Sequence, residues 1–332
     1  MSYSIFLIFL FLSSAKSTEL KSLKFEQVPN TEVYNYFEKP LNVPDKNLGF
    51  KLNPSTQLRH VRKYKESIVY DVVYSIDDQG RRLHSTTQSN STNQNFAVFF
   101  GCSFIFGIGI NDDKTLPHFF QKNRPSYNVY NYGVGGTGPN YMLAQLQAGQ
   151  LNKDQLGESG VLIYSYIPNH LRRANGLWPS LRWTAPTPYY EIQNEKLVRE
   201  KNFTEGRYWQ TLLYSFVGKA LSVLGKPYVD FPQINQKHVN HTCQIIQESQ
   251  KEFLKQFPTS KFYTLIHPSS KDYSSVSYKH TLSLIKCLKT KNISVIEMRY
   301  DLDIENYAIQ NDHHPTALSN KEIAEKLKQV IL

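Results

Sequence analysis

The sequence predicts an α/β protein built around a parallel β-sheet, and two observations lead to this prediction. From residue 96 onward, short apolar runs alternate with segments of helical character, which is the pattern of βαβ units. Side chains able to do chemistry follow directly after several of these runs, and ligands of open α/β sheets sit beyond the carboxyl ends of the strands. The 332 residues suffice for one large domain, or for a core domain of about 200 residues with a smaller addition in front.

The elements of this domain can be assigned in chain order. The predicted strands are residues 96–100, 127–132, 161–166, 262–266 and 293–298. The predicted helices are residues 116–122, 141–151, 244–256, 277–288 and 321–332. Five parallel strands with helices on both faces make a flavodoxin-like arrangement. Residues 171–240 are rich in Trp, Tyr and Pro without clear periodicity, so we expect an insertion that covers or borders a site.

The first 17 residues have the character of a secretory signal peptide. An apolar run of roughly 10 residues, from Tyr3 to Leu12, precedes small residues suited to cleavage before Thr18 or just after Ala15. This run is shorter than the approximately 20 residues that a membrane-spanning helix needs. We therefore expect an exported protein, periplasmic or extracellular. No Lys or Arg precedes the run, so an uncleaved N-terminal membrane anchor is the alternative.

A β-rich extension is expected between the signal peptide and the α/β domain, over residues 18–94. Residues 67–76 are rich in β-branched and aromatic side chains and end at an Asp-Asp-Gln-Gly turn. The polar stretch 85–95 then predicts a linker or a surface loop. The α/β domain is accordingly assigned to residues 95–332.

The net charge and the motifs of the sequence limit the classes of binding partner that can be expected. Lys and Arg number 38 against 28 Asp and Glu, a net charge of +10, which suits an anionic glycan or envelope surface unless the charge only solubilises the chain. Nucleic acid is not expected, because the sequence lacks zinc-finger spacing, an Arg-rich helix and an RNP-like motif. No cofactor is predicted, and no metal, since four histidines share no ligand spacing. They are His118, His238, His241 and His267.

Three cysteines in an exported chain leave at least one thiol unpaired. Cys102 is expected to be the free one. Cys243 and Cys287 each lie in a stretch of helical character and could form a disulfide in an oxidising compartment. The sequence leaves this open, because it does not fix the distance between their Cα atoms.

Two candidate blocks follow the first two strands. In Gly101-Cys102-Ser103, the two small residues allow a sharp turn that would present Ser103 Oγ above the sheet. Residues 131–138 hold four glycines, among them Gly136, which permit positive φ and bring backbone N–H groups close to a ligand. A phosphate-binding loop is the rival interpretation, but the Lys-Ser/Thr ending of that motif is missing.

Two further blocks supply polar side chains. Asn169 follows the third strand, where its amide could donate to the same ligand. Asp312 and His314 precede the last helix and offer an acid and a base two residues apart. Serine is a poor nucleophile unless such a base, held by a carboxylate, lies within hydrogen-bond reach.

In order and spacing, these blocks resemble those of the SGNH hydrolases, or GDSL-like esterases and lipases, over roughly residues 96–332. The first block is similar to a subgroup that opens with Gly-Cys-Ser-Phe. The resemblance implies a three-layer α/β/α domain with Ser103 as nucleophile, His314 as base and Asp312 as its orienting acid. It also implies an oxyanion hole formed by the backbone N–H groups of Ser103 and Gly136 and by the side chain of Asn169.

The blocks depart from the usual family pattern at three places. Cys102 stands where Asp is usual, and a thiol nucleophile is an alternative to Ser103, although we expect a small buried residue there. The third block, 167–170, differs from the usual Gly-x-Asn-Asp. The acid and base follow an Asp-x-His spacing, so His313 competes with His314, which is preferred because a proline follows it.

Residues near the third block are candidates for substrate binding. His170, Arg172 and Arg173 could bind an anionic or sugar substrate, or could be solvated loop residues. Trp178 and Trp183 of the insertion could stack on a sugar ring or pack the insertion onto the core.

The predicted function is hydrolysis of an acyl ester, such as an O-acetyl ester, through an acyl-enzyme on Ser103. One alternative hands the acyl group to a sugar hydroxyl and is an O-acyltransferase of envelope or exported polysaccharide. Another is a non-catalytic glycan-binding or envelope-structural protein on the same fold, with the β-rich extension as its interaction module. Taken as structural residues, Ser103 and Asp312 would be helix caps. The oligomeric state, the acyl chain and the alcohol portion are not predicted.

Overall fold

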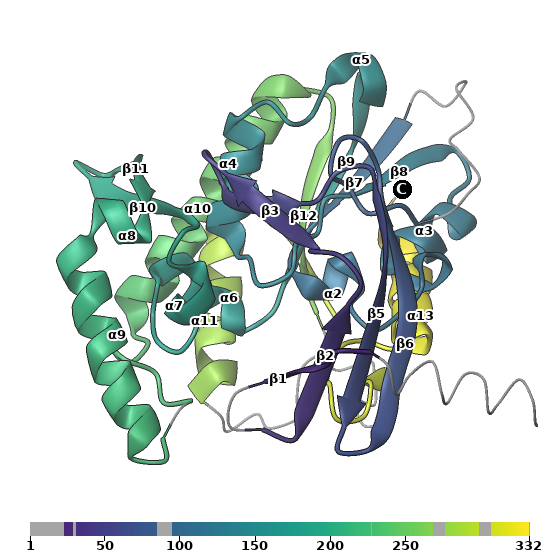
Figure 1. Cartoon of the computed structure of the whole chain (residues 1–332). Coiled ribbons are helices and arrows are strands. Elements are labelled where there is room, and N and C mark those ends of the chain that lie inside the picture. Colours follow the sequence, from purple (N-terminus) through teal and green to yellow (C-terminus); the bar gives the residue numbers. More distant parts are fainter. Residues whose placement is uncertain are drawn as a thin grey trace, which may run out of the picture.

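The computed structural model describes residues 23–28, 31–84, 95–226, 228–267, 276–298 and 307–331. The predicted signal peptide and residues 85–94 of the predicted linker lie outside these ranges. An antiparallel β-sheet stands beside an α/β domain, and further helices extend to the opposite edge of the molecule (Figure 1). No described helix is long and apolar enough to cross a membrane.

The α/β domain contains the predicted five-stranded parallel sheet. Its strands are β7 (Asn95–Phe100), β8 (Tyr127–Asn131), β9 (Ser159–Tyr166), β12 (Lys261–Ile266) and β13 (Ser294–Glu297). Their order is β13-β12-β9-β7-β8, and every neighbouring pair is parallel. The order reverses between β7 and β9, which is where open α/β sheets bind their ligands. Segments that follow β7, β8 and β9 therefore meet at one edge of the sheet.

Helices cover both faces of this sheet, which confirms the three-layer α/β/α prediction. One face carries α4 (Pro139–Gln147), α10 (Gln236–Gln256) and α11 (Val276–Thr290), and the other carries α3 (Leu116–Asn123) and α13 (Ala317–Val330). Side chains along β7 alternate between the layers: Phe96 and Val98 pack with the first group, Ala97 and Phe99 with the second. Three short helices complete the domain: α2 (Ser103–Phe106), the 3-10 helix η1 (Asp112–Lys114) and α5 (Lys153–Leu156).

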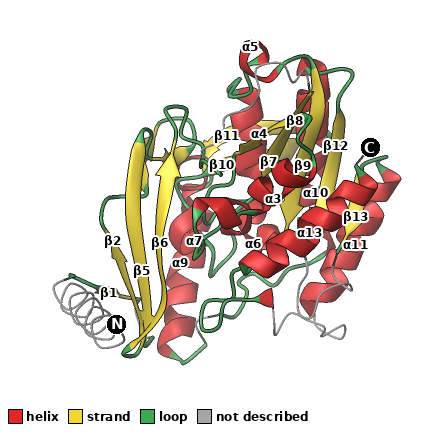
Figure 2. Cartoon of the chain, turned by 90° about the vertical axis from the view of Figure 1, so that its right-hand side faces the viewer, coloured by secondary structure: helices red, strands yellow, loops and turns green. Residues whose placement is uncertain are grey.

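The N-terminal region is β-rich, as predicted. Its sheet has the order β1-β2-β5-β6, formed by β1 (Glu26–Gln27), β2 (Val33–Phe37), β5 (Thr56–Tyr64) and β6 (Ser67–Ile76). A separate hairpin pairs β3 (Asn42–Asp45) with β4 (Gly49–Leu52). Strands β2, β5 and β6 form an upright layer beside the α/β domain (Figure 2).

The N-terminal sheet and the α/β domain share one hydrophobic core. Leu58 and Tyr74 of the sheet are fully buried and belong to the same cluster as Phe106 of α2 and Tyr141 of α4. The extension therefore does not stand apart as a separately packed module, and its inner face lies against the segment that begins with Ser103.

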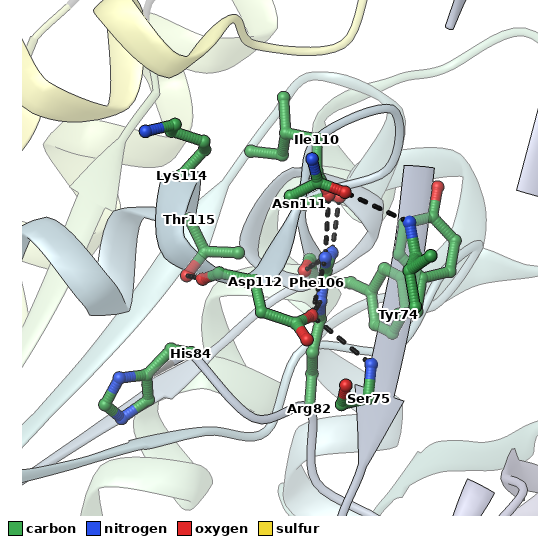
Figure 3. A network of polar contacts seen from close by, with 12 residues as sticks. Tyr74, Ser75, Arg82, His84, Phe106, Ile110, Asn111, Asp112, Lys114 and Thr115 are labelled. Carbon is green, nitrogen blue, oxygen red and sulfur yellow. Dashed lines mark hydrogen bonds and ion pairs between the residues drawn. The ribbon is translucent and has the colours of Figure 1, made fainter. Parts of the chain in front are cut away.

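A buried arginine adds polar contacts to this junction (Figure 3). The Arg82 guanidinium donates to the carbonyl oxygens of Phe106 (2.7 Å), Gly107 (2.5 Å) and Ile110 (2.7 Å). It also donates to the carboxylate of Asp112 at 3.0 Å. A buried charge is tolerated only when its donors are satisfied in this way. Arg82 thus fixes the chain that follows α2 against the N-terminal sheet.

The predicted insertion contains helices and strands that its sequence pattern did not predict. Its elements are α6 (Asn169–Asn175), α7 (Leu181–Thr184), β10 (Pro188–Gln193), β11 (Lys196–Asn202), α8 (Phe203–Gly206) and α9 (Tyr208–Val223). Strands β10 and β11 form a hairpin that turns at Asn194 and Glu195, both with positive φ. Helix α9 buries Thr211 and Gly218 and exposes apolar residues such as Trp209 and Phe216, so it lacks the usual pattern of buried apolar and exposed polar residues from which a helix is recognised.

The open question about the cysteines is answered by a disulfide between Cys243 of α10 and Cys287 of α11, with Cα atoms 6.3 Å apart. Cys102 is free and buried, as expected.

Helix α10 begins well before the predicted residue 244, because the Asn235 side chain accepts hydrogen bonds from the N–H groups of Lys237 and His238.

Candidate active site

Ser103 is the first residue of α2 and lies just beyond the end of β7. A glycine is needed at position 101, because a Cβ there would lie 2.7 Å from the Ile105 side chain and 3.2 Å from the Ser165 carbonyl oxygen. The N-cap position of α2 belongs to Cys102, whose side chain makes no capping hydrogen bond. Ser103 is therefore not a capping serine, and its half-buried side chain lies at the ligand-binding edge of the sheet.

The glycine-rich loop after β8 lies against this turn. A Cβ on Gly135 would be 4.0 Å from the Ser103 Cβ, and a Cβ on Gly133 would be 2.5 Å from the Phe106 backbone nitrogen. Gly136 has a φ of +80°, a left-handed conformation that favours glycine. Neither the N–H of Ser103 nor that of Gly136 has a hydrogen-bond acceptor among the described residues. Both groups are thus open to a ligand, as an oxyanion hole requires.

The carbonyl side of the same loop is held by the insertion and by α6. The Trp183 indole donates to the Gly136 carbonyl oxygen at 3.1 Å, and the Arg173 guanidinium donates to that of Thr137 at 2.9 Å. A Cβ on Gly136 would come within 3.0 Å of the Trp183 ring. Trp183, 39% exposed, therefore forms a wall beside Gly136, and a side chain at position 136 would collide with it.

Asn169 is exposed and begins α6, directly after β9. Its Oδ1 accepts a hydrogen bond from Arg172, whose guanidinium also forms an ion pair with Asp230. This bond fixes the orientation of the Asn169 amide group. Its nitrogen can then donate a hydrogen bond to a ligand. Strand β9 neighbours β7, so this donor belongs to the same edge of the sheet as Ser103.

A tight turn before α13 brings the predicted acid and base together. The Ile309 N–H donates to the His314 carbonyl oxygen at 2.8 Å, while Asn311 and His313 adopt positive φ. In this turn the His313 side chain is exposed to solvent. The His314 side chain points to Asp312 instead, and its Nδ1 forms a short hydrogen bond with the Asp312 carboxylate. Of the two histidines, His314 is therefore the one that pairs with Asp312.

Helix α13 is capped by a different residue. Thr316 accepts a hydrogen bond from the Ser319 N–H at 3.2 Å, so Asp312 is not a capping acid. The Phe104 ring makes edge contacts with the rings of His314, at a centroid distance of 5.4 Å, and His267, at 4.9 Å. Because Phe104 follows Ser103, this contact places His314 beside the turn that carries the serine.

The environment of Asp312 favours the ionised form of its carboxyl group. Burial alone would raise the pKa of Asp312, but the hydrogen bond from His314 and the positive charge of Arg62 outweigh it and lower the pKa below its ordinary value. An ionised carboxylate only accepts hydrogen bonds, so His314 Nδ1 must carry the hydrogen. In the neutral imidazole, the other ring nitrogen, Nε2, then carries the lone pair and can act as a base.

Two residues of the N-terminal sheet also reach this carboxylate. Arg62 Nε lies 3.5 Å from Asp312 Oδ2, and the Asp312 side chain is only 1% exposed. Tyr70, the cross-strand partner of Arg62 in the β5–β6 hairpin, adds to the lowering of the Asp312 pKa. The predicted extension therefore contributes side chains to the site, and no local pattern in the sequence indicates this.

His60 lies next to these residues but is fixed in a structural role. Burial lowers the pKa of His60 to about 3. The Tyr74 hydroxyl accepts from the Gly109 N–H, so it donates to His60 Nδ1 at 2.9 Å, and His60 Nε2 faces Asn35 Oδ1 at 3.3 Å. His60 is thus neutral and satisfied in the sheet.

The three candidate substrate-binding residues have other contacts. His170 is completely buried, and its Nδ1 pairs with the Tyr164 hydroxyl at 2.6 Å, so direct contact with a substrate is a wrong assignment for it. Arg173 is also buried, and its guanidinium donates to the Thr137 carbonyl oxygen in the glycine-rich loop. Its contact is therefore with this loop and not with a substrate. Arg172 remains at the surface of the site, where it orients Asn169.

No family model matches the sequence, and no curated protein does. A member of the lipolytic protein G-D-S-L family from Veillonella parvula is similar with a TM-score of 0.41 and 11% identity, over 71% of this chain and 98% of its own. The psychrotrophic esterase EstA from a Pseudoalteromonas species has a TM-score of 0.40 and 13% identity, over 72% and 96%. A carbohydrate acetylesterase from Sinorhizobium meliloti has a TM-score of 0.38 and 10% identity, over 71% and 100%. The chain is similar to these proteins at low identity, and a function has to be argued from its own side chains.

Proposed function

We propose that the chain is a carboxylic ester hydrolase that works through an acyl-enzyme on Ser103. The observation that carries this proposal is the Asp312–His314 pair, which contacts Phe104 and so lies beside Ser103. Open backbone N–H groups of Ser103 and Gly136 at the same edge support it further.

In the proposed reaction, His314 Nε2 takes the proton of Ser103 Oγ while the oxygen attacks the ester carbonyl carbon. The N–H groups of Ser103 and Gly136 and the amide of Asn169 donate to the oxyanion that forms. Collapse of this intermediate breaks the bond to the alcohol, which receives the proton from His314. A water molecule, deprotonated by the same histidine, then releases the acid.

The proposal is tested with purified protein that lacks residues 1–17, on p-nitrophenyl esters from acetyl to dodecanoyl. We expect turnover of at least one ester, and a fluorophosphonate should attach covalently to Ser103, as read from the mass of its peptide. A label on Cys102, or neither turnover nor label, would contradict the proposal. With a sugar acceptor present, formation of acylated sugar instead of free acid would identify the O-acyltransferase alternative.

Arg62 supplies a second test, because it acts on the reaction through Asp312. Replacing Arg62 with Gln removes the positive charge that lowers the pKa of Asp312, so this pKa should rise. We expect kcat to fall roughly tenfold with KM unchanged, and the loss of activity on acidification to begin at higher pH. Arg62→Lys should restore most of the rate.

A matched control is available on the same strand. Arg59 of β5 forms an ion pair with Asp71 at 2.7 Å, and its side chain is about as exposed as that of Arg62. Arg59→Gln should leave kcat and its pH profile unchanged. If both glutamine variants lower kcat equally, Arg62 acts only through the stability of the sheet.

The disulfide supports the further proposal that the protein is exported. A bond between Cys243 and Cys287 persists in oxidising compartments and is rare where thiols are kept reduced.

A further inference from the structure

Helix α9 presents a continuous apolar face that no described part of the chain covers. Trp209, Phe216 and Val223 recur at seven-residue spacing and are 78%, 72% and 88% exposed. Leu212, Leu213 and Leu224 extend the same exposed surface. Single exposed apolar residues are ordinary, but a contiguous patch of this kind marks an interaction surface.

The opposite side of α9 accounts for its position in the fold. Gly218 lies directly on the buried Trp178, since a Cβ there would be 2.0 Å from the indole ring. Thr211 is buried and donates to the Phe203 carbonyl oxygen at 2.7 Å. Gly218 and Thr211 thus attach this side of α9 to the rest of the fold, whereas the apolar residues of the other face lie at the surface. The helix runs along the outer edge of the molecule (Figure 1).

The charges around this face indicate the chemistry of its partner. No Asp or Glu occurs between residues 206 and 229, whereas Lys219 and Lys226 are exposed. Lys219 follows Phe216 by three positions and therefore lies at the border of the apolar face, where its ammonium can reach beyond the apolar side chains. The whole chain carries a net charge of +10, so an anionic partner is favoured.

The size of the face argues against a second copy of this chain as the partner. A helix of 16 residues is about 24 Å long and about 10 Å wide with its side chains. The product of this length and width is an area of about 240 Å², well below the roughly 800 Å² that each partner buries in a stable protein interface. A bilayer sets no such threshold, because an amphipathic helix lies in the interface with only its apolar face inserted. Trp and Tyr favour this zone, and Tyr208 and Tyr228 are exposed next to the face.

We propose that the exposed face of α9 is a docking surface for an anionic phospholipid bilayer. It inserts Trp209, Phe216 and Val223 into the interface, while Lys219 and Lys226 contact the headgroups. Docking would orient the insertion toward the bilayer, and this insertion also carries Trp183 beside Gly136. Binding to the bilayer does not depend on hydrolysis.

The fluorescence of Trp209 gives a direct test. The chain has three tryptophans: Trp178 is buried, Trp183 is 39% exposed and hydrogen-bonded to Gly136, and Trp209 is 78% exposed, so we expect Trp209 to dominate the response to vesicles. Vesicles of phosphatidylcholine with about 30% phosphatidylglycerol should shift the emission to the blue and should co-sediment with the protein. Phosphatidylcholine alone should bind about tenfold or more weakly.

Variants separate the two parts of the surface. Phe216→Glu should abolish the blue shift and lower vesicle binding at least about tenfold, whereas Leu282→Glu, on the exposed side of α11, should bind like the unchanged protein. Lys219→Gln with Lys226→Gln should weaken binding about fivefold for each charge and remove its salt dependence. Ser103→Ala should bind vesicles normally, so a failure of docking and a failure of the proposed reaction are distinguishable.

Two results would overturn the proposal. One is the absence of binding to both kinds of vesicle at low salt. The other is concentration-dependent self-association, measured by sedimentation velocity, that Phe216→Glu abolishes while vesicle binding stays the same, which would identify a second copy as the partner.

Discussion

Replacing Ser103 with Ala should lower kcat for the best ester by roughly 10⁴–10⁶, to a residual rate set by the oxyanion donors and by binding alone. The loss is this large because the hydroxyl is the atom that forms the acyl-enzyme, and no neighbouring group can replace it in the same geometry. KM should change little, since the N–H donors and Asn169 remain. Steady-state kinetics and burst measurements on both proteins check this, and covalent labelling at position 103 should disappear.

Cys102 provides the control for this change. It precedes Ser103, is 1% exposed and is free, so it is the nearest alternative nucleophile. Cys102→Ala should keep the rate within a few-fold and lower the free energy of unfolding by about 1 kcal/mol through lost packing. The opposite pattern, with an active Ser103→Ala and an inactive Cys102→Ala, would transfer the chemistry to the thiol. Absence of turnover in the unchanged protein as well as in both variants would favour the non-catalytic binding alternative.

The sheet could be predicted from the sequence for a physical reason. Strands buried on both faces are continuous apolar runs, and residues Phe96 to Phe100 are all buried in this way. The carboxyl ends of neighbouring parallel strands meet at one edge, so the placement of Ser103, Gly136 and Asn169 followed from the strand assignment. Asp312 and His314 could be predicted to lie close together because they are only two residues apart in the sequence.

Contacts across the fold could not be predicted in the same way. Arg62 and Tyr70 face each other in a hairpin far from Asp312 in the sequence, and no local pattern indicates that this hairpin packs against the C-terminal turn. His170 is the last residue of the third block, yet the first turn of α6 buries it completely. The exposed face of α9 was equally unpredictable, because exposure is decided by what packs nearby rather than by composition.

The second large effect is expected at Asp312. In Asp312→Asn the side chain keeps its size but loses its charge, and its amide can donate to His314 Nδ1. The hydrogen of His314 would then move to Nε2, which could no longer accept the proton of Ser103. We expect kcat to fall by about 10⁴ with KM nearly unchanged. Steady-state kinetics across the pH range measure this, together with thermal unfolding to show that the fold is intact.

Asp71 is the matched control, since it is a partly buried carboxylate in the same hairpin as Arg62 and is paired with Arg59. Asp71→Asn should leave kcat unchanged although it also removes one partner of an ion pair. If Asp312→Asn retained activity within about tenfold of the unchanged protein, Asp312 would only hold the C-terminal turn against Arg62, and His314 would orient without it. A combined Asp312→Asn and Arg62→Gln variant then separates the two roles: in the proposed reaction the second change adds little, because Arg62 acts only through the charge of Asp312.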